Sequence, residues 1–193
     1  MKKISNMNIA GIGLLSAIVI ILQFLGSFIR LGPFSVSLVL IPIVVGGAMY
    51  GLSAGGFLGA VFGLTVLLSG DAAAFLAINP VGAVITVMLK GFLCGIAAPF
   101  VYGLLRKYGQ TKALAAAALV CPFVNTGVFL ICCRFFFMDT IRMWAQGAGF
   151  GENALAYMIL GLVGGNFLFE VVVNAVLCPA VLKIIKVINK GKF

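Results

Sequence analysis

Residues 9–29 read IAGIGLLSAIVIILQFLGSFI, and this stretch decides the class of protein. Only Ser16, Gln23 and Ser27 place polar side chains in its 21 residues. As an α-helix rising about 1.5 Å per residue, it is long enough to cross the roughly 30 Å hydrocarbon core of a bilayer. A secretory signal peptide would have a shorter apolar region and a clear small-residue cleavage site. We therefore expect an integral membrane protein whose first helix is transmembrane.

The composition of the whole chain agrees with this interpretation. Of 193 residues, 63% are hydrophobic and only 17 are charged, namely 13 Lys or Arg and 4 Asp or Glu. Soluble domains carry roughly 25% charged residues, so a soluble globular protein is excluded. At about 20 residues per crossing, the length allows about six crossings and leaves no room for an appended nucleotide-binding domain.

The apolar runs predict one all-α membrane domain, residues 1–193, with six transmembrane helices. The expected spans are about 9–29, 36–50, 52–69, 80–105, 113–133 and 154–185. A polar loop is expected after the fifth span, because Arg134, Asp139, Arg142, Gln146 and Glu152 lie there. Six crossings place both termini on one side of the membrane.

The basic residues indicate which side is cytoplasmic. The predicted terminal side carries nine of them: Lys2, Lys3, Arg106, Lys107, Lys112, Lys183, Lys186, Lys190 and Lys192. The other side carries three, Arg30, Arg134 and Arg142. Cytoplasmic loops of membrane proteins are enriched in Lys and Arg, so both termini are predicted to be cytoplasmic. The net charge of +9 is scattered between apolar runs, which disfavours a nucleic-acid partner.

Several catalytic chemistries are excluded by the residues that the chain lacks. It has no histidine, four acidic residues and no Gly-rich phosphate motif, so we expect no enzyme, no metal site and no cofactor. Its five cysteines lie in or beside apolar segments without a CxxC pair, and we expect them to be structural.

Glycines spaced four residues apart predict close helix packing. Positions 51, 55, 59 and 63 fall on one stripe of the third span, and 91 and 95 repeat the spacing in the fourth. On the first span, Gly13 and Ala17 form a similar small-residue pair. That pair could serve internal packing or a partner subunit.

Ionisable residues inside apolar spans point to function, because burying them in a bilayer is costly. Lys90 lies within the fourth span and Glu170 within the sixth. Asn166, Glu170 and Asn174 are spaced i, i+4, i+8 and form one polar stripe, which must face a cavity or another helix. Two hypotheses stay open: a buried Lys90–Glu170 ion pair, or a ligand pocket that uses some of these groups.

Two helix interruptions and one loop add further candidates. Asn79 precedes Pro80 and is expected to cap the fourth span, and Asn125 follows Pro122 at a break in the fifth. The first outer loop combines the cation Arg30, a Gly-Pro turn and the aromatic Phe34, and could act as a lid.

The segment from Leu31 to Ser37 (LGPFSVS), followed by Ile41-Pro42 and a glycine-rich third span, resembles a known family. So does the closing stretch from Asn166 to Asn174 (NFLFEVVVN) with Pro179 and a lysine-rich tail. The family comprises the substrate-binding (S) components of energy-coupling factor (ECF) transporters, the vitamin importers of prokaryotes. Overall size and six predicted spans are also similar.

This resemblance implies a subunit that captures a vitamin outside the plasma membrane and releases it inside. The implied partners are a transmembrane coupling subunit and two ABC-type ATPases, and Gly13 and Ala17 match the positions where small residues contact the coupling subunit. Family binding regions here hold Arg30, Phe34, Asn79, Lys90, Asn166, Glu170 and Asn174, to which the helix break adds Asn125. By depth, Asn79 and Asn166 are expected to touch substrate, with Lys90 and Glu170 behind them.

Other functions remain as alternatives at this stage. The chain could be a membrane scaffold that binds no ligand, or a small stand-alone transporter. The cations Arg30 and Lys90 favour an anionic vitamin such as pantothenate or folate. Aromatic residues near the outer face, such as Phe34 and Phe150, would also suit the flat ring of riboflavin.

Overall fold

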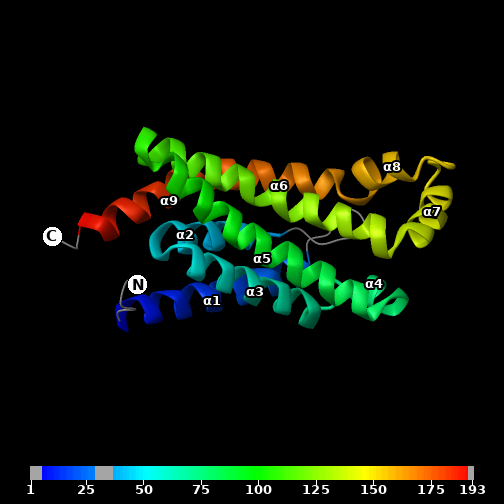
Figure 1. Ribbon diagram of the computed structural model, residues 1–193, viewed down its shortest axis with the longest axis horizontal. Coiled ribbons are helices and arrows are strands. Elements are labelled where there is room, and N and C mark those ends of the chain that lie inside the picture. Colours follow the sequence, from blue (N-terminus) through cyan, green and yellow to red (C-terminus); the bar gives the residue numbers. More distant parts are fainter. Residues whose placement is uncertain (1–5, 29–36, 191–193) are drawn as a thin grey trace.

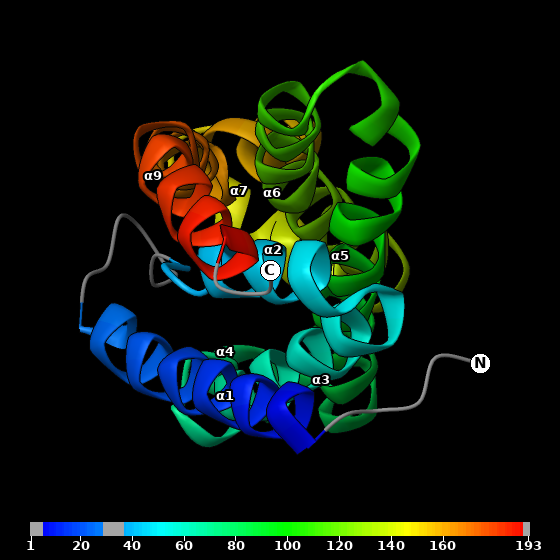
Figure 2. The same ribbon diagram turned by 90° about the vertical axis from the view of Figure 1, so that its left-hand side faces the viewer.

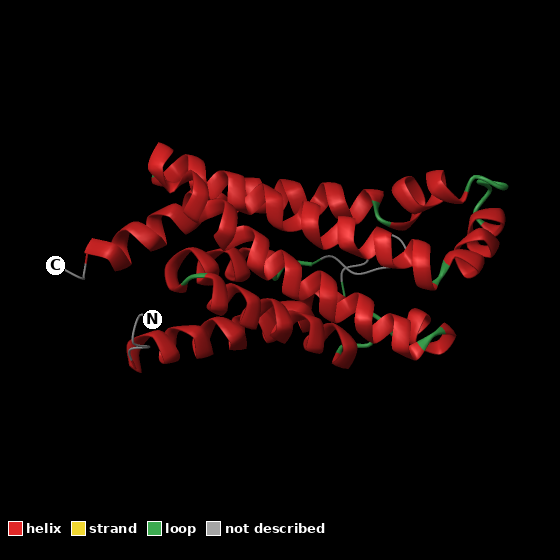
Figure 3. Cartoon of the chain, in the orientation of Figure 1, coloured by secondary structure: helices red, strands yellow, loops and turns green. Residues whose placement is uncertain are grey.

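The computed structural model describes residues 6–28 and 37–190, and within these ranges the chain is helical with no strand (Figure 3). The elements are α1 (Asn6–Ser27), α2 (Leu40–Tyr50), α3 (Leu52–Leu68), α4 (Ala73–Ile78), α5 (Pro80–Leu105), the 3-10 turn η1 (Arg106–Tyr108), α6 (Gln110–Phe136), α7 (Met138–Gly147), α8 (Ala154–Ala156), the π-helical η2 (Tyr157–Leu162) and α9 (Gly164–Lys190). The all-α class is confirmed for this part of the chain.

The long helices lie side by side along one axis (Figure 1). The start of α1 and the end of α9 lie at the same end of the bundle, and α4 and α7 lie at the opposite end. Figure 2 looks along the bundle from the end that holds α1's start and α9's end. The basic turn η1 lies at this end too, so the predicted charge asymmetry has a structural counterpart. The assignment of that end to the cytoplasm stays a prediction.

Helix lengths support some membrane crossings more strongly than others. Ile9–Ser27, Pro80–Tyr108 and Gln110–Phe136 are each long and apolar enough to span a bilayer, and the bent pair of Ala154–Leu162 and Gly164–Pro179 makes a fourth candidate. With 11 residues, α2 reaches about 16 Å, well short of the roughly 30 Å core. Six complete crossings therefore stay a prediction.

The glycine stripes bring α3 and α5 into backbone contact. A Cβ atom added at Gly59 would overlap the carbonyl oxygen of Gly91, and one added at Gly55 would overlap that of Gly95. The reciprocal additions on α5 meet the carbonyls of Gly59 and Gly55. The predicted close packing is confirmed, and it joins two helices of the same chain. At the start of this stripe Gly51 has a φ of 94°, which allows the sharp turn from α2 into α3.

The segment after α6 corrects the sequence analysis, which predicted a polar loop there. Arg134 belongs to the last turn of α6, and residues Met138–Gly147 form the helix α7. Ile141 and Ala145, one turn apart, are fully buried, while Asp139 and Arg142 form a 3.1 Å salt bridge on the exposed face. The sequence analysis interpreted the charged residues as a loop and missed this amphipathic spacing. Such spacing allows one face of a helix to be buried, which stabilises the helix.

The predicted break after Pro122 is absent, because α6 continues through this proline from Gln110 to Phe136. The predicted last span, 154–185, by contrast, is not one continuous helix. Its first part, α8 and η2, is bent by 41° from α9 at a break around Val163. Gly161 and Gly164 flank the break, and π-helical turns of this kind occur often at functional sites. The break lies three residues before Asn166, at the point where the polar stripe of α9 begins.

Candidate functional site

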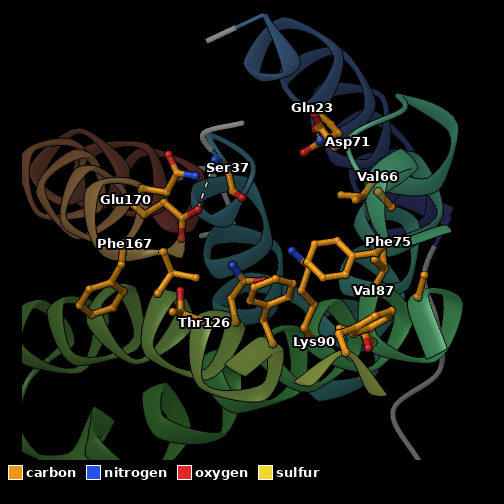
Figure 4. A pocket seen from close by; sticks show the side chains of 18 residues that line it. Gln23, Ser37, Val66, Asp71, Phe75, Val87, Lys90, Thr126, Phe167 and Glu170 are labelled. Carbon is orange, nitrogen blue, oxygen red and sulfur yellow. Dashed lines mark hydrogen bonds between the residues drawn. The ribbon is translucent and has the colours of Figure 1, made fainter. Parts of the chain in front are cut away.

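A cavity opens between helices at the end of the bundle away from the start of α1 and the end of α9 (Figure 4). The space between its walls is about 700 Å³ when the part open to solvent is included. The lining residues are Gln23, Ser37, Val66, Asp71, Ala72, Phe75, Ala83, Thr86, Val87, Lys90, Asn125, Thr126, Phe129, Phe137, Val163, Asn166, Phe167 and Glu170. Most come from the later parts of α1, α3 and α6, from α4, and from the earlier parts of α5 and α9, and the others lie in the connections between helices.

Aromatic rings form one wall of this cavity. The short helix α4 presents Phe75, whose ring packs edge-on against Phe129 of α6 at 5.7 Å and against Phe137 at 4.6 Å between centroids. Trp144 of α7 packs against the same ring at 5.6 Å. Edge-to-face aromatic contacts hold rings in defined orientations. The helix α7, which the sequence analysis missed, therefore supports the aromatic wall from behind.

Lys90 contributes the amine of the cavity. It lies on α5 one turn after Thr86, whose hydroxyl donates a 2.6 Å hydrogen bond to the Gly82 carbonyl. The ammonium group lies 5.4 Å from the ring centroid of Phe62 and 5.5 Å from that of Phe129. Cation–π contacts of this kind partly replace the hydration that the ammonium loses.

Glu170 reaches the same space from α9, opposite Lys90 (Figure 4). The polar stripe of α9 is buried as expected, with Asn166, Glu170 and Asn174 each at most 6% exposed. One carboxylate oxygen of Glu170, Oε1, accepts a hydrogen bond from the Ser37 backbone N–H at 3.3 Å. Within the described residues, the other oxygen, Oε2, has no hydrogen-bond donor, and Lys90 and Glu170 form no salt bridge.

A further polar pair, in which one member is buried and the other half-buried, was missed by the sequence analysis. Gln23, 2% exposed on α1, donates from Nε2 to the Asp71 carboxylate in the turn after α3, and more weakly to the Ser69 hydroxyl at 3.4 Å. Both Gln23 and Asp71 line the cavity. The isolated glutamine in an apolar run was the available signal, since a buried amide needs a partner. The pair joins α1 to the α3–α4 turn at the cavity wall.

The predicted site residues divide into three groups. Lys90, Asn125, Asn166 and Glu170 line the cavity together. Asn79 and Asn174 do not appear in its lining. The remaining two, Arg30 and Phe34, lie outside the described residues.

The two asparagines outside the lining have structural contacts instead. Asn79 accepts a 2.9 Å hydrogen bond from the Gly82 N–H, so the predicted N-cap of the helix that begins at Pro80 is confirmed. Asn174 donates a 2.8 Å hydrogen bond to the Glu170 backbone carbonyl and lines a separate, smaller cavity with Cys178.

Gly13 and Ala17 are exposed on α1, in the part of the helix that precedes Gln23. A Cβ atom added at Gly13 would have no atom within 4 Å. This small-residue surface is therefore not used for packing within the described part of the chain.

Comparison with known protein families gives a match over nearly the whole chain. The model of the family described as "ECF transporter, substrate-specific component" matches residues 7–182. The chain belongs to this family. Among curated proteins no match is found.

Membership makes the protein a substrate-binding subunit of a transporter rather than an enzyme. As an S component it is a multi-pass membrane protein, in agreement with its apolar helices. Among the described residues, no group of three or more acidic or cysteine side chains could hold a metal ion. The polar groups of the cavity are candidates for recognising a ligand.

The location of Asn79 allows its two predicted roles, as a helix N-cap and as a substrate contact, to be tested separately. We expect Asn79→Ala to lower the free energy of unfolding by about 1 kcal/mol, because the substitution removes the N-cap of α5. Ligand affinity should change less than about twofold, since Asn79 does not line the cavity. Thermal unfolding and ligand titration of the purified variant measure the two effects. A large loss of affinity without a loss of stability would instead assign Asn79 to the binding site.

Proposed function

We propose that this S component captures a vitamin or related small molecule at the outer face of a prokaryotic plasma membrane and passes it inward. The observation that carries the proposal is the cavity, which Lys90 and Glu170 enter from opposite walls and which Asn125 and several aromatic rings also line. Ligand sites typically combine apolar walls with a few convergent polar groups. The cavity lies opposite the basic end of the bundle, so cytoplasmic termini would make it face outward.

The packing of the glycine stripes argues against the scaffold alternative. A scaffold would present such stripes to other proteins, but Gly55, Gly59, Gly91 and Gly95 are used between α3 and α5 of the same chain. A scaffold also has no need to bury a lysine and a glutamate beside an open cavity, where both cost free energy. A ligand that contacts them accounts for both.

Transport would require partner subunits. We propose a transmembrane coupling subunit that contacts α1 at Gly13 and Ala17, and two ABC-type ATPases that supply energy to the coupling subunit. The exposure of both small residues on α1 supports a helix-to-helix contact at this surface.

A thermal-shift panel tests whether the protein binds a vitamin. The purified protein, in lipid nanodiscs, is heated with riboflavin, folate, pantothenate, thiamine, biotin, pyridoxamine or nicotinate. A compound present at 100 times its dissociation constant should stabilise the folded state by about 2.7 kcal/mol, enough for a clear rise in the unfolding midpoint. Unchanged midpoints with every compound, and no small molecule bound after purification, would contradict the proposal.

The charged groups of the cavity restrict which substrate charges are compatible with it. The sequence favoured an anionic vitamin, and Lys90 in the wall supports an acceptor group on the ligand. Glu170 and Asp71 line the same cavity, however, so a purely anionic ligand would meet two carboxylates. A substrate that only accepts hydrogen bonds is therefore disfavoured.

A further inference from the structure

Lys90 and Glu170 are oppositely charged residues that line the same cavity but do not form an ion pair. They extend into one cavity from opposite walls, α5 and α9, without forming a salt bridge (Figure 4). Among the described residues the salt bridge that does form is the exposed one between Asp139 and Arg142. A buried charge without a partner is costly, so the space between the two groups requires a complementary occupant.

The surroundings of Lys90 and of Glu170 indicate which hydrogen-bonding groups the occupant must have. The Lys90 ammonium has two aromatic faces, Phe62 and Phe129, as neighbours, and aromatic faces offer no lone pair to its N–H groups. It therefore calls for a hydrogen-bond acceptor, best a carbonyl or carboxylate oxygen. Glu170 is 4% exposed and its Oε2 has no donor among the described residues, so it calls for an N–H group.

The neighbouring polar groups also favour a ligand that carries a hydrogen-bond donor at the Glu170 side of the cavity. Asn125, 4% exposed and also in the cavity lining, has an Oδ1 atom that accepts no hydrogen bond within the described residues. It provides a second acceptor for a ligand donor. Asp71, the other carboxylate of the cavity, is already bonded to Gln23. The open acceptors of the cavity therefore include groups on α6 and α9, with Gln23 Oε1 of α1 as a further one, and its amine donor belongs to α5.

The aromatic wall limits the shape of the ligand. Phe75 packs edge to face against Phe129 and against Phe137, and all three rings line the cavity. Phe167 lines it from α9. Such rings pack well against a flat aromatic body and supply affinity by burying its faces.

We propose that the ligand is an amphoteric heteroaromatic compound that bridges Lys90 and Glu170. It presents an oxygen acceptor to Lys90 Nζ, an N–H donor to Glu170 Oε2 and Asn125 Oδ1, and a flat ring to the phenylalanines. The assignment rests on the proposed function, since it names the chemical class of the substrate in the same cavity.

The first test uses the vitamin panel with the wild-type protein, so it does not depend on the folding of any variant. We expect the stabilising compound to be an aromatic ring that carries both N–H donors and oxygen acceptors, which in this panel means riboflavin, folate, pyridoxamine or thiamine. Stabilisation by nicotinate, pantothenate or biotin alone would overturn the assignment while leaving the capture function intact. Stabilisation by none would contradict the capture function itself.

The second test removes each charge while keeping side-chain size. In isothermal titration with the stabilising compound, Lys90→Met and Glu170→Gln should each weaken binding at least about tenfold, because each removes a charge-assisted hydrogen bond. Asp139→Asn is the matched control, since it makes the same acid-to-amide type of change at an exposed salt bridge and should leave affinity unchanged. Wild-type affinity in either Lys90→Met or Glu170→Gln would overturn the assignment.

The double variant separates a bridging ligand from a direct Lys90–Glu170 pair. If the ligand bridges the two groups, their effects on the stability of the ligand-free protein should nearly add, because no salt bridge joins them and only a longer-range attraction between the charges couples them. If they pair directly, removing both charges would cost much less than the sum of the single changes. Such a rescue in the ligand-free protein would overturn the assignment.

Discussion

Gly13→Leu and Ala17→Leu should each abolish uptake by whole cells while ligand binding by the isolated S component is retained. Both positions are exposed on α1, and an added side chain at Gly13 meets open space in this chain. A leucine there would keep a coupling-subunit helix from approaching closely, as small-residue interfaces require. We expect uptake of the stabilising vitamin to fall at least about tenfold and its dissociation constant to stay within about twofold.

Gly103→Leu is the control for this pair of variants. Gly103 is also exposed on a helix and also has open space where a Cβ would lie, but it belongs to α5 rather than to the proposed contact surface. Uptake should be normal in this variant. Normal uptake in Gly13→Leu and Ala17→Leu would place the coupling surface elsewhere on the protein.

The second large effect concerns stability. Gly59→Ala should destabilise the protein, although alanine is the better helix former by about 1 kcal/mol. The new methyl group overlaps the Gly91 carbonyl oxygen of α5, so the two backbones must separate. Overpacking of this kind typically costs about 1–3 kcal/mol.

Buried cysteines provide the measurement of this effect. Cys94, Cys121 and Cys133 are free and buried, so a thiol-reactive fluorophore labels them as the protein unfolds on heating. The unfolding midpoint of Gly59→Ala should lie below that of wild type, and that of the matched variant Gly103→Ala at or above it. Equal midpoints for the two variants would mean that α3 and α5 are not in backbone contact at Gly59.

Local sequence patterns predicted the parts of the fold that depend on single helices. The apolar runs, the glycine spacing of α3 and the polar stripe of α9 each follow a helical period, and each is found in the structure. Intramembrane charges are rare because they are costly, so Lys90 and Glu170 stood out before their positions were known. Both lie in the cavity lining.

The features that were missed depend on contacts between distant segments or on weak local signals. Gln23 and Asp71 are 48 residues apart, and no local period connects them. The buried face of α7 rests on Ile141 and Ala145, which were obscured by the charges around them. The bend before Asn166 lies at two glycines, Gly161 and Gly164. Glycines also occur in straight membrane helices, where they allow close packing, so they did not predict a bend.

Helix position alone does not give side-chain direction, so depth could not predict which groups line the cavity. Lys90 and Glu170 line it together with Asn166, whereas Asn79 does not. Asn79 faces its own helix end, because the Gly82 N–H at the start of α5 needs an acceptor.

Mass spectrometry of the small molecules released by the protein tests ligand capture most directly. Wild-type protein and the Lys90→Met/Glu170→Gln double variant are purified from the same medium and heat-denatured, and the soluble fraction is analysed. We expect wild type to release one heteroaromatic compound with both N–H donors and oxygen acceptors, and the double variant to release little or none of it. Release of no compound by wild type, with no midpoint raised by the vitamin panel, would contradict the account, as would equal release by both proteins.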